Sequence, residues 1–410
     1  MIGQAALHEH EALVPSAYVV ENPAERRTIL TRLAKQYGGP PRPCRAFPGG
    51  HPTSLTRPDI ARVRAETCFF SLKTDGVRYL LLLCDLGDEY KAFCIDRCLR
   101  IFEIVVWCNE DYFTKTTLLD GELVFDHARN RLCYQVFDVV TMRGRSCRAM
   151  RYSDRLQVLH DHLLSEIPDG MDESSELFEQ YIADEDKLYC AHRADVCMHM
   201  APKRFVPLDG ARRLWHERHQ SPFPNDGLIV HFDDCPIASG TCRDQLKWKP
   251  NNAIDVLLDI EGHAVRGVRC REDGREVALR TLEVDGAAYE VDVEDNHLLQ
   301  CLVHRKQHGA CALVECLVSF SDDGRAKLWP MRERTDKVEA NDVRVIRSTL
   351  RVIREAVGLD ELLPPPPSDC VQGAPPPPSV VARPDEAGAA AAADPPVPEQ
   401  AAPRRSKRRR

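Results

Sequence analysis

The sequence predicts a two-domain α/β (α+β) protein, rich in β-strands, that ends in a segment without regular structure. Its 410 residues exceed one average domain, and a hydrophobic content of 43% is enough for two cores. Short apolar runs rich in Val, Leu, Phe and Cys dominate the chain before residue 364. Beyond that point, proline and alanine replace the large apolar side chains that a packed core needs.

The predicted strands of the first domain, residues 1–250, are separated by turn signals. They are TCFFSL, VRYLLLLC, KTTLLDGELVF, RLCYQVFDVV, DGLIVHF and QLKWKP, and AIDVLLDI follows just after them. Several of these runs meet at Asp-Gly pairs, which favour the tight turns of β-hairpins. We therefore expect hairpins at these pairs.

Two segments have the apolar spacing of amphipathic helices. Residues 153–164 begin at Ser153 and residues 341–357 begin at Asn341, two residue types that often cap the start of a helix. The apolar positions are Leu156, Leu159 and Leu163 in the first segment and Val343, Ile346, Leu350 and Ile353 in the second. Both helices should pack one face against the rest of the protein.

Residues 251–340 form the second predicted domain. Polar and apolar residues alternate over short stretches such as REVALRTLEV, AAYEVDV and CALVECLVSF. This alternation is typical of strands with one buried face. Several such strands in a short segment favour a small antiparallel barrel.

Residues 364–410 contain 13 of the 29 prolines, an alanine run at 389–393 and the basic end RRSKRRR. This composition buries too little apolar surface to offset chain entropy, so we expect a disordered tail. The basic end is either a nuclear import signal, which is the interpretation we prefer, or a nucleic-acid tether or a solvated charged end. We accordingly expect the protein in the nucleus.

The distribution of charge limits the kinds of partner. The formal net charge is −8, and since residues 404–410 contribute six positive charges, residues 1–403 carry −14. A protein that grips nucleic acid over a broad face is usually basic, so any such contact here must be confined to a groove. The apolar runs fall far short of the ~20 residues that span a membrane, and the N-terminal residues lack the pattern of a secretory signal. We expect an intracellular protein with no membrane partner.

Seventeen cysteines are scattered along the chain, which favours reduced thiols over a disulfide framework. Two clusters have separations short enough for a zinc site: Cys190, His192, Cys197 and His199, and Cys301, His304, His308 and Cys311. Neither has a familiar finger spacing. Ordinary core or surface roles remain the alternative for both clusters.

The segment KTDGVR at residues 73–78 is the first candidate for chemistry. A lysine at the end of a strand, beside an Asp-Gly turn, can reach into a cleft, and the glycine lets the backbone approach a ligand closely. Lysine is a nucleophile only when neutral, so burial or neighbouring cations must lower its pKa. Arg78, Lys247 and Lys249 can supply such cations. The alternative is a hairpin turn with a solvated lysine.

Five further segments follow in order along the chain: LLDGELVF at 118–125, YQVFDVV at 134–140, NDGLIVHF at 225–232, QLKWKP at 245–250 and LWPMRERTDK at 328–337. Together with KTDGVR, this ordered set resembles the covalent nucleotidyltransferase superfamily of capping enzymes and polynucleotide ligases. FPGGHPTSLTR at 47–57, the tryptophan of LKWKP and the RxRxDK element are similar to mRNA guanylyltransferases in particular. The resemblance covers residues 40–350, although His51 stands where many relatives have glutamine.

The resemblance implies a reaction, in which Lys73 takes GMP from GTP as a covalent lysyl-N-GMP and passes it to the 5′-diphosphate end of an RNA. It also implies a role for each of the following residues: Arg78 and Glu122 for the ribose hydroxyls, Phe137 for stacking on guanine, Asp226 for a divalent metal, Lys247 and Lys249 for the α-phosphate, and Arg334, Asp336 and Lys337 for the leaving pyrophosphate. Hard oxygen ligands select Mg²⁺ or Mn²⁺.

The implied architecture is an α/β (α+β) nucleotidyltransferase domain over residues 1–250 and a C-terminal OB-fold β-barrel domain over residues 251–340. A helix over 341–360 would pack back on the first domain. The chain has no HCxxxxxR phosphatase signature, no convincing pair of ExExE strands and no glycine-rich methyltransferase loop. We therefore expect a separate RNA triphosphatase and cap methyltransferase as partners, and RNA polymerase is a further candidate.

Two alternative functions remain open from the sequence. An ATP-dependent polynucleotide ligase would also use Lys73, but the RxRxDK element argues against it. A catalytically silent scaffold that binds RNA or polymerase would have no need of the intact Lys73, Glu122 and paired lysines.

Overall fold

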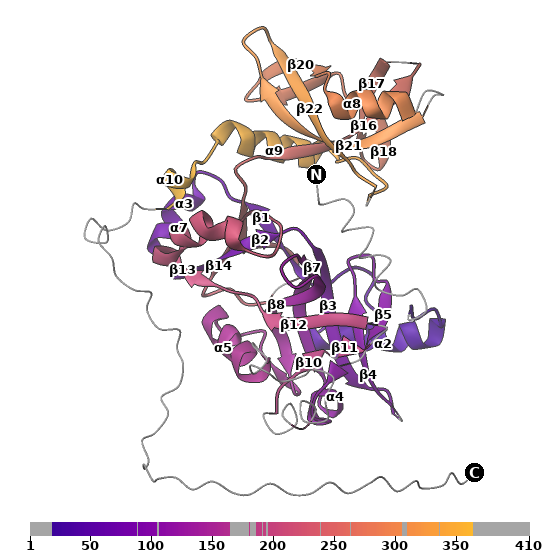
Figure 1. Ribbon diagram of the computed structural model, residues 1–410, viewed down its shortest axis with the longest axis vertical. Coiled ribbons are helices and arrows are strands. Elements are labelled where there is room, and N and C mark those ends of the chain that lie inside the picture. Colours follow the sequence, from indigo (N-terminus) through magenta and orange to yellow (C-terminus); the bar gives the residue numbers. More distant parts are fainter. Residues whose placement is uncertain are drawn as a thin grey trace, which may run out of the picture. The chain divides into compact units, whose positions relative to one another are not determined.

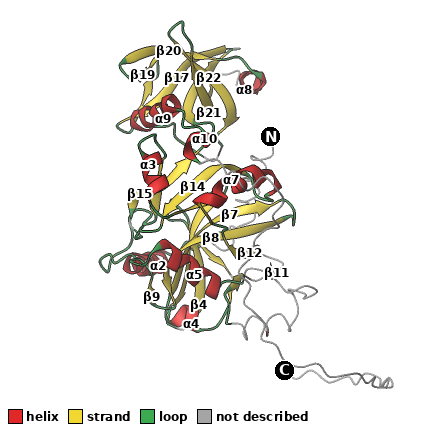
Figure 2. Cartoon of the chain, turned by 90° about the vertical axis from the view of Figure 1, so that its left-hand side faces the viewer, coloured by secondary structure: helices red, strands yellow, loops and turns green. Residues whose placement is uncertain are grey.

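The computed structural model describes residues 19–363, except 88, 105, 165–179, 181–185, 191, 194–195, 238, 263, 306–309 and 336. The described part is a mixed α/β fold dominated by sheets, as the sequence predicts (Figure 1; Figure 2). The chain divides into two compact units, Met1–Pro365 and Pro366–Arg410, and the second unit, with the predicted tail, lies outside the described residues. Every described helix is too short or too polar to cross a membrane.

The larger sheet of the first half of the chain has eight strands. Its main path runs β11-β12-β8-β7-β3-β4-β5, and β9 pairs with β8. The strands are β3 (Val77–Asp85), β4 (Tyr90–Ile95), β5 (Ile101–Ile104), β7 (Thr117–Asp126), β8 (Arg131–Met142), β9 (Arg145–Ser146), β11 (His192–Arg193) and β12 (Val196–Pro202). A separate two-stranded sheet joins β6 (Val106–Trp107) to β10 (Tyr189–Cys190).

The apolar run YLLLLC forms most of β3, which is buried on both faces. Leu81 and Leu83 belong to a core that also includes residues of α4 (Asp111–Thr114) and α5 (Tyr152–His162). Leu80 and Leu82 face the opposite core, which α2 (Pro23–Gln36) covers. Successive side chains of a strand point to opposite faces, so two covered faces require the uninterrupted apolar run.

The smaller sheet has five strands in the order β1-β15-β14-β2-β13. They are β1 (Gly50–Ser54), β2 (Cys68–Thr74), β13 (Val206–Pro207), β14 (Asn225–Phe232) and β15 (Gly240–Trp248). Residues of α3 (Asp59–Ala65) and α7 (Leu208–His216) join its core, where Phe70 and Leu228 are fully buried. This sheet carries the predicted nucleophile at the end of β2.

Three Asp-Gly pairs of the first predicted domain do not form hairpins, contrary to the expectation from sequence, whereas Asp273–Gly274 and Asp285–Gly286 of the second half do. Asp75–Gly76 connects β2 to β3, which belong to different sheets. Asp120–Gly121 and Asp226–Gly227 lie inside β7 and β14, where shifts of register mark bulges. Glycine is needed there for space, because a Cβ atom at Gly227 would lie 2.1 Å from the carbonyl oxygen of Trp248.

The second half of the chain forms a seven-stranded, mostly antiparallel sheet in the order β18-β17-β16-β21-β22-β20-β19. The strands are β16 (Ala253–Glu261), β17 (Ala264–Glu272), β18 (Arg275–Ala278), β19 (Thr281–Val284), β20 (Ala287–Val293), β21 (Ala310–Phe320) and β22 (Arg325–Glu333), and α8 (His297–Arg305) precedes β21. Ile254, Val256, Val314 and Leu328 are among the buried residues of its own core.

This sheet closes on itself. Its edge strands β18 and β19 are consecutive in the chain, with only Leu279 and Arg280 between them. The Leu279 N–H donates to the Val268 carbonyl of β17, and the Arg280 carbonyl accepts from the Val291 N–H of β20. One continuous segment therefore joins the two edges, and the small barrel expected from the alternating pattern is present.

Both helices predicted from apolar spacing are present, as α5 and as α9 (Val343–Glu355). Their caps differ from the expected ones. α5 begins one residue before Ser153 without a side-chain cap, and Asp342 caps α9 by accepting from a backbone N–H. Asn341 accepts instead from the backbone N–H of Asp255 at 2.8 Å, which ties the start of α9 to β16.

The segment after residue 341 only partly follows the expectation that it packs on the first domain. Ile346 and Leu350 of α9 are buried in the core of the barrel. The chain contacts the first half again further along, at α10 (Leu359–Leu362), whose Leu362 lies in the core of the five-stranded sheet. The Val357 carbonyl also accepts a hydrogen bond from the Trp248 indole at 2.8 Å.

Candidate active site

The candidate site lies where the two sheets of the first half diverge. The chain leaves the five-stranded sheet after Lys73, turns at Asp75–Gly76 and enters the eight-stranded sheet near Arg78. Lys73 is paired with the bulged part of β14, next to Asp226, and Arg78 is paired with Glu122 on β7. Strand pairing in two sheets thus gathers residues that are far apart in sequence.

Asp226 links two lysines. Its Oδ1 atom accepts from Lys73 Nζ at 2.8 Å, and its Oδ2 atom lies 2.6 Å from Lys249 Nζ. Burial raises the pKa of Asp226, but the two ammonium groups outweigh burial and the pKa falls below its usual 3.8. Asp226 is therefore an anion that fixes the nucleophile beside a second cation.

Lys247 adds a third positive charge from β15, two residues before Lys249. Its pKa is lowered, first by burial and then by the charges of Lys249 and Lys73. No ion pair of Lys247 is found among the described residues, whereas Lys249 is paired with Asp226, so the Lys247 ammonium group is available to an anionic ligand. The sequence-predicted grouping of Lys73, Lys247 and Lys249 is thus present.

Arg78 is almost fully buried, and its guanidinium group makes hydrogen bonds and ring contacts. Its Nε and Nη2 atoms donate to the two oxygens of Asp120 at 2.8 and 2.6 Å, and Nη1 donates to the Gly50 carbonyl. Its guanidinium carbon lies 5.2 Å from the Phe47 ring centre and 5.4 Å from that of Phe137. Although burial lowers the pKa of Arg78, Asp120 raises it further, so the side chain stays charged.

Glu122 belongs to a polar chain that begins next to the nucleophile. Its Oε2 atom accepts from the Thr74 hydroxyl and lies 3.4 Å from Lys203 Nζ, which also donates to Thr74 Oγ1 at 2.9 Å. Lys203 is 6% exposed, and burial lowers its pKa despite the neighbouring carboxylate. Sequence analysis missed Lys203, because one lysine in APKRF has no spacing signal that separates it from a surface residue.

Arg334 and Lys337, two of the residues predicted to contact pyrophosphate, are paired with Asp255 of β16. Arg334 Nη1 lies 3.1 Å from Asp255 Oδ1, and Lys337 Nζ donates to Asp255 Oδ2 at 2.6 Å, both within the barrel. Asp336 lies outside the described residues. Among the described residues of this motif, Arg332 approaches the nucleophile turn, with Nη1 3.5 Å from Asp75 Oδ2.

A cavity of about 860 Å³ opens beside the paired lysines. Its lining includes Lys247 of β15, Lys249 just after that strand, Trp329 of β22 and Val352 of α9, but not Lys73 or Asp226. This volume lies within the range of about 300–1,000 Å³ that is common for ligand pockets. Charged and aromatic side chains in the lining suit a ligand with phosphate groups and planar rings.

Of the two clusters considered as zinc sites, the first lies mostly outside the described side chains, and the described members of the second have other partners. In the first, the side chains of Cys190, His192 and Cys197 are outside the described residues. In the second, His308 is also outside, Cys301 lies 3.8 Å from His297 Nδ1, and Cys311 contacts Asp259. Over the described residues, the one group of three ligand-type side chains is Cys235, Cys242 and Asp244.

Comparison with known proteins identifies the class of this fold and site. Residues 11–251, more than half of the chain, match the family model described as mRNA capping enzyme, catalytic domain. The chain belongs to this family, which confirms the resemblance found in the sequence.

Individual relatives agree with the family match. The mRNA-capping enzyme of Caenorhabditis elegans is 28% identical, over 75% of this chain and 46% of that protein. The mRNA-capping enzyme subunit alpha of Schizosaccharomyces pombe is 26% identical, over 82% of this chain and 83% of that protein. The chain thus spans about half the length of the nematode relative. A solved mycobacterial DNA ligase D overlaps 72% of this chain and 98% of its own, with 15% identity and a TM-score of 0.37.

Proposed function

We propose that this protein is an mRNA guanylyltransferase. It transfers GMP from GTP to Lys73, and from Lys73 to the 5′-diphosphate end of an RNA, forming a GpppN cap. The observation that carries the proposal is the geometry of Lys73, whose amine is fixed by Asp226 within a group of cations, in a chain of the capping-enzyme family. Phosphoryl transfer depends mainly on such positioning and charge neutralisation.

The first step requires a neutral amine on Lys73. The Nζ lone pair attacks the α-phosphorus of GTP, the bond from that phosphorus to the bridging oxygen breaks, and pyrophosphate leaves with the electron pair. The amine proton is lost to solvent. Lys247 and Lys249 lie close to Lys73 and would attract the negative oxygens of the phosphate.

The second step returns Lys73 to its starting state. A terminal oxygen of the RNA diphosphate attacks the phosphorus of lysyl-N-GMP, and the P–N bond breaks as the amine regains a proton. Asp226 can then accept its hydrogen bond from Lys73 again. Because the amide-like P–N bond replaces the charged ammonium in the intermediate, Asp226 has one cationic partner fewer during that interval.

Asp226 is also the residue that we propose to hold a divalent metal, Mg²⁺ or Mn²⁺. The donor chemistry fits, since a carboxylate at the edge of a phosphate site is the usual protein ligand of Mg²⁺. The carboxylate is 37% exposed, so it is accessible to a hydrated ion. When bound, the metal would neutralise charge on the phosphate oxygens.

The nucleoside is proposed to lie near the turn that carries Lys73. Glu122 and Arg78 would bind the ribose, and Phe137 would stack on guanine. In support of this, Glu122 accepts a hydrogen bond from Thr74, the residue after the nucleophile, and Phe137 lies against Arg78. Arg78 already uses Nε and both Nη atoms in protein contacts, so it would act mainly by holding this wall of the site in place.

We propose further that the barrel is an OB-fold domain and that Arg334, Asp336 and Lys337 reach the β- and γ-phosphates of GTP. In the described arrangement Arg334 and Lys337 are paired with Asp255. These ion pairs must therefore open, or Asp255 must move with them, when the triphosphate is bound. A closing motion of the barrel would provide this rearrangement and exclude water from the reaction.

The reactions before and after guanylyl transfer require other catalytic groups. We propose that a separate RNA triphosphatase and a cap methyltransferase provide them, that RNA polymerase is a partner, and that the basic end at 404–410 directs the protein to the nucleus. A fluorescent fusion without residues 364–410 should then shift to the cytoplasm. Retained nuclear accumulation would remove the import role.

Incubation of the full chain with Mg²⁺ and α-labelled GTP or ATP, followed by denaturing electrophoresis, tests the proposed function. The guanylyltransferase assignment predicts label from GTP only. Label from ATP only would indicate a ligase, and the absence of label from both would indicate a scaffold without catalysis.

A further inference from the structure

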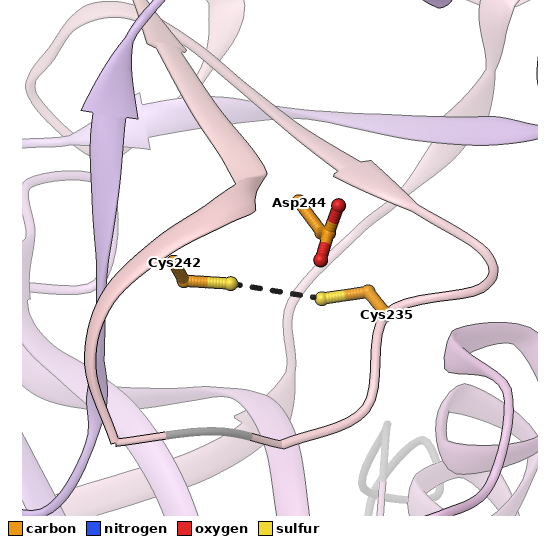
Figure 3. Close-up of side chains that lie close together, drawn as sticks. All are labelled: Cys235, Cys242 and Asp244. Carbon is orange, nitrogen blue, oxygen red and sulfur yellow. Dashed lines mark hydrogen bonds between the residues drawn. The ribbon is translucent and has the colours of Figure 1, made fainter.

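Two buried thiols and a carboxylate lie together at the connection between β14 and β15. Cys235 follows β14, whereas Cys242 and Asp244 are part of β15. The Cys235 and Cys242 Sγ atoms are 3.9 Å apart, and the residues are 1% and 6% exposed. A carboxylate oxygen of Asp244 lies within 4.8 Å of both sulfurs. In Figure 3 the two thiols point toward one another, with Asp244 beside them.

We propose that Cys235, Cys242 and Asp244 bind one Zn²⁺ ion. Two thiolates at about 2.3 Å from a tetrahedral zinc are separated by about 3.8 Å, and the observed Sγ–Sγ distance of 3.9 Å agrees with that edge. A disulfide requires about 2.0 Å, so the sulfurs would have to approach by almost half of their separation. Soft sulfur ligands favour zinc over magnesium or calcium.

The backbone holds these ligands in place before a metal binds. Cys242 and Asp244 are two residues apart on one strand, so their side chains project to the same side. The Cys235 carbonyl accepts from Arg155 Nη1 at 2.9 Å, and the Ile237 N–H donates to the Arg148 carbonyl at 2.9 Å. Little conformational entropy would be lost when the ion enters.

A charged neighbour orients the carboxylate of the cluster. Arg62 Nη2 donates to Asp244 Oδ1 at 2.7 Å, which orients the carboxylate as an outer-shell partner of a metal ligand often does. With Zn²⁺ bound, two thiolates and one carboxylate would surround the ion, and Arg62 is paired with both Asp244 and Glu66. Binding releases the two thiol protons to solvent. Water would complete the tetrahedron, because the Asp244 side chain is 36% exposed.

The proposed ion would have a structural role, because it would link the end of β14 to the start of β15. The ligands lie at the end of β14 and the start of β15, whereas Asp226 begins β14 and Lys247 lies near the end of β15. Zinc would therefore fix the connection between the two strands from the end opposite the lysines. This proposal does not depend on the proposed guanylyl transfer.

Metal binding by the full chain tests the proposal. The protein is prepared with a non-chelating reductant, and Zn²⁺ is titrated in competition with a chromophoric chelator. One ion per chain should bind, and Cys235→Ala or Cys242→Ala should weaken binding at least about 100-fold, the upper end of what loss of an outer-shell partner costs. Cys94→Ala, which removes a buried thiol in another core, should leave the affinity unchanged.

A second measurement keeps the test valid if an alanine variant fails to fold. Co²⁺ added to the wild-type protein should give thiolate-to-cobalt charge-transfer absorption, which Zn²⁺ then abolishes. The proposal is overturned if the folded wild type shows no such absorption, if zinc affinity survives both cysteine substitutions, or if mass spectrometry of the reductant-treated protein finds Cys235 joined to Cys242 as a disulfide.

Discussion

Lys73 Nζ donates a hydrogen bond to Asp226 Oδ1 at 2.8 Å, from the end of β2 to the bulged start of β14. The two residues are 153 positions apart, yet the pairing of these strands fixes one against the other. Lys249 holds the second oxygen of Asp226, so the carboxylate cannot rotate away from the nucleophile without breaking that ion pair. The position of the amine is therefore set by the sheet.

Asp226→Asn should slow the guanylylation of Lys73. The amide keeps the shape of the side chain but loses the charge that holds Lys73 and Lys249, and it is a weaker metal ligand. We expect a loss of about 100- to 1,000-fold in the single-turnover rate, as for removal of one preorganised charged group at a reaction centre. Asp234→Asn, an exposed change after the same strand, serves as the control and should react at the wild-type rate.

The buried pair of Arg78 and Asp120 should matter most for stability. Arg78→Met leaves Asp120 buried without its partner, for which a loss of about 3–5 kcal/mol in the free energy of unfolding is typical. The double variant Arg78→Met/Asp120→Leu should recover much of that loss, because no buried charge remains. Urea unfolding of the wild type and the two variants measures the difference, and a double variant as unstable as Arg78→Met would contradict this account.

His231 predicts a pH dependence of stability. It is buried between Phe205 and Tyr152, and burial, aided by nearby cations, lowers its pKa well below 6.5. Below pH 6.5 the unfolded chain therefore binds a proton that the folded chain does not, so stability falls as the pH falls through 6.5. Relative to His231→Phe, the wild type should lose about 1.4 kcal/mol between pH 7.5 and 5.5. Equal losses in both proteins, measured by urea unfolding, would refute this assignment.

Lys337→Ala should separate the two half-reactions. The proposed contact with the leaving pyrophosphate exists only while GTP is bound, so lysyl-GMP formation should slow by about thirty- to a thousandfold, or ~2–4 kcal/mol. Its reversal by pyrophosphate should slow equally, whereas GMP transfer from the isolated intermediate to diphosphate-ended RNA should change little. Lys327→Ala, on β22 and paired with Glu294, is the matched control. An equal loss in the transfer step would indicate a structural or RNA-binding role for Lys337.

The sequence was sufficient to predict the elements whose signals are local. The continuous apolar run at 79–84 corresponds to β3, a strand that is buried on both faces. The helical spacing at 341–357 corresponds to α9, a helix with one apolar face. α2 also had such a signal, with Asn22 as a cap and Pro23 in the first turn, and it was overlooked.

The remaining features depend on contacts between distant segments. Asp273–Gly274 is a hairpin turn as such pairs usually are, but tertiary packing makes Asp120–Gly121 and Asp226–Gly227 bulges, where Gly227 has no room for a side chain. Lys203 meets Glu122 only because β12 lies beside β8. Cys235 and Cys242 come together because β14 and β15 are neighbours, whereas short spacing in sequence had favoured other clusters.

The identity of the nucleophile is the central claim, and one labelling measurement tests it most directly. Wild-type protein and Lys73→Ala are each incubated with Mg²⁺ and α-labelled GTP, and the labelled protein is digested and mapped by mass spectrometry. We predict an acid-labile, alkali-stable GMP adduct on Lys73 in the wild type and no adduct in Lys73→Ala, which should remain folded because the side chain is partly exposed. A GMP adduct on another residue, or one that persists in Lys73→Ala, would contradict the account.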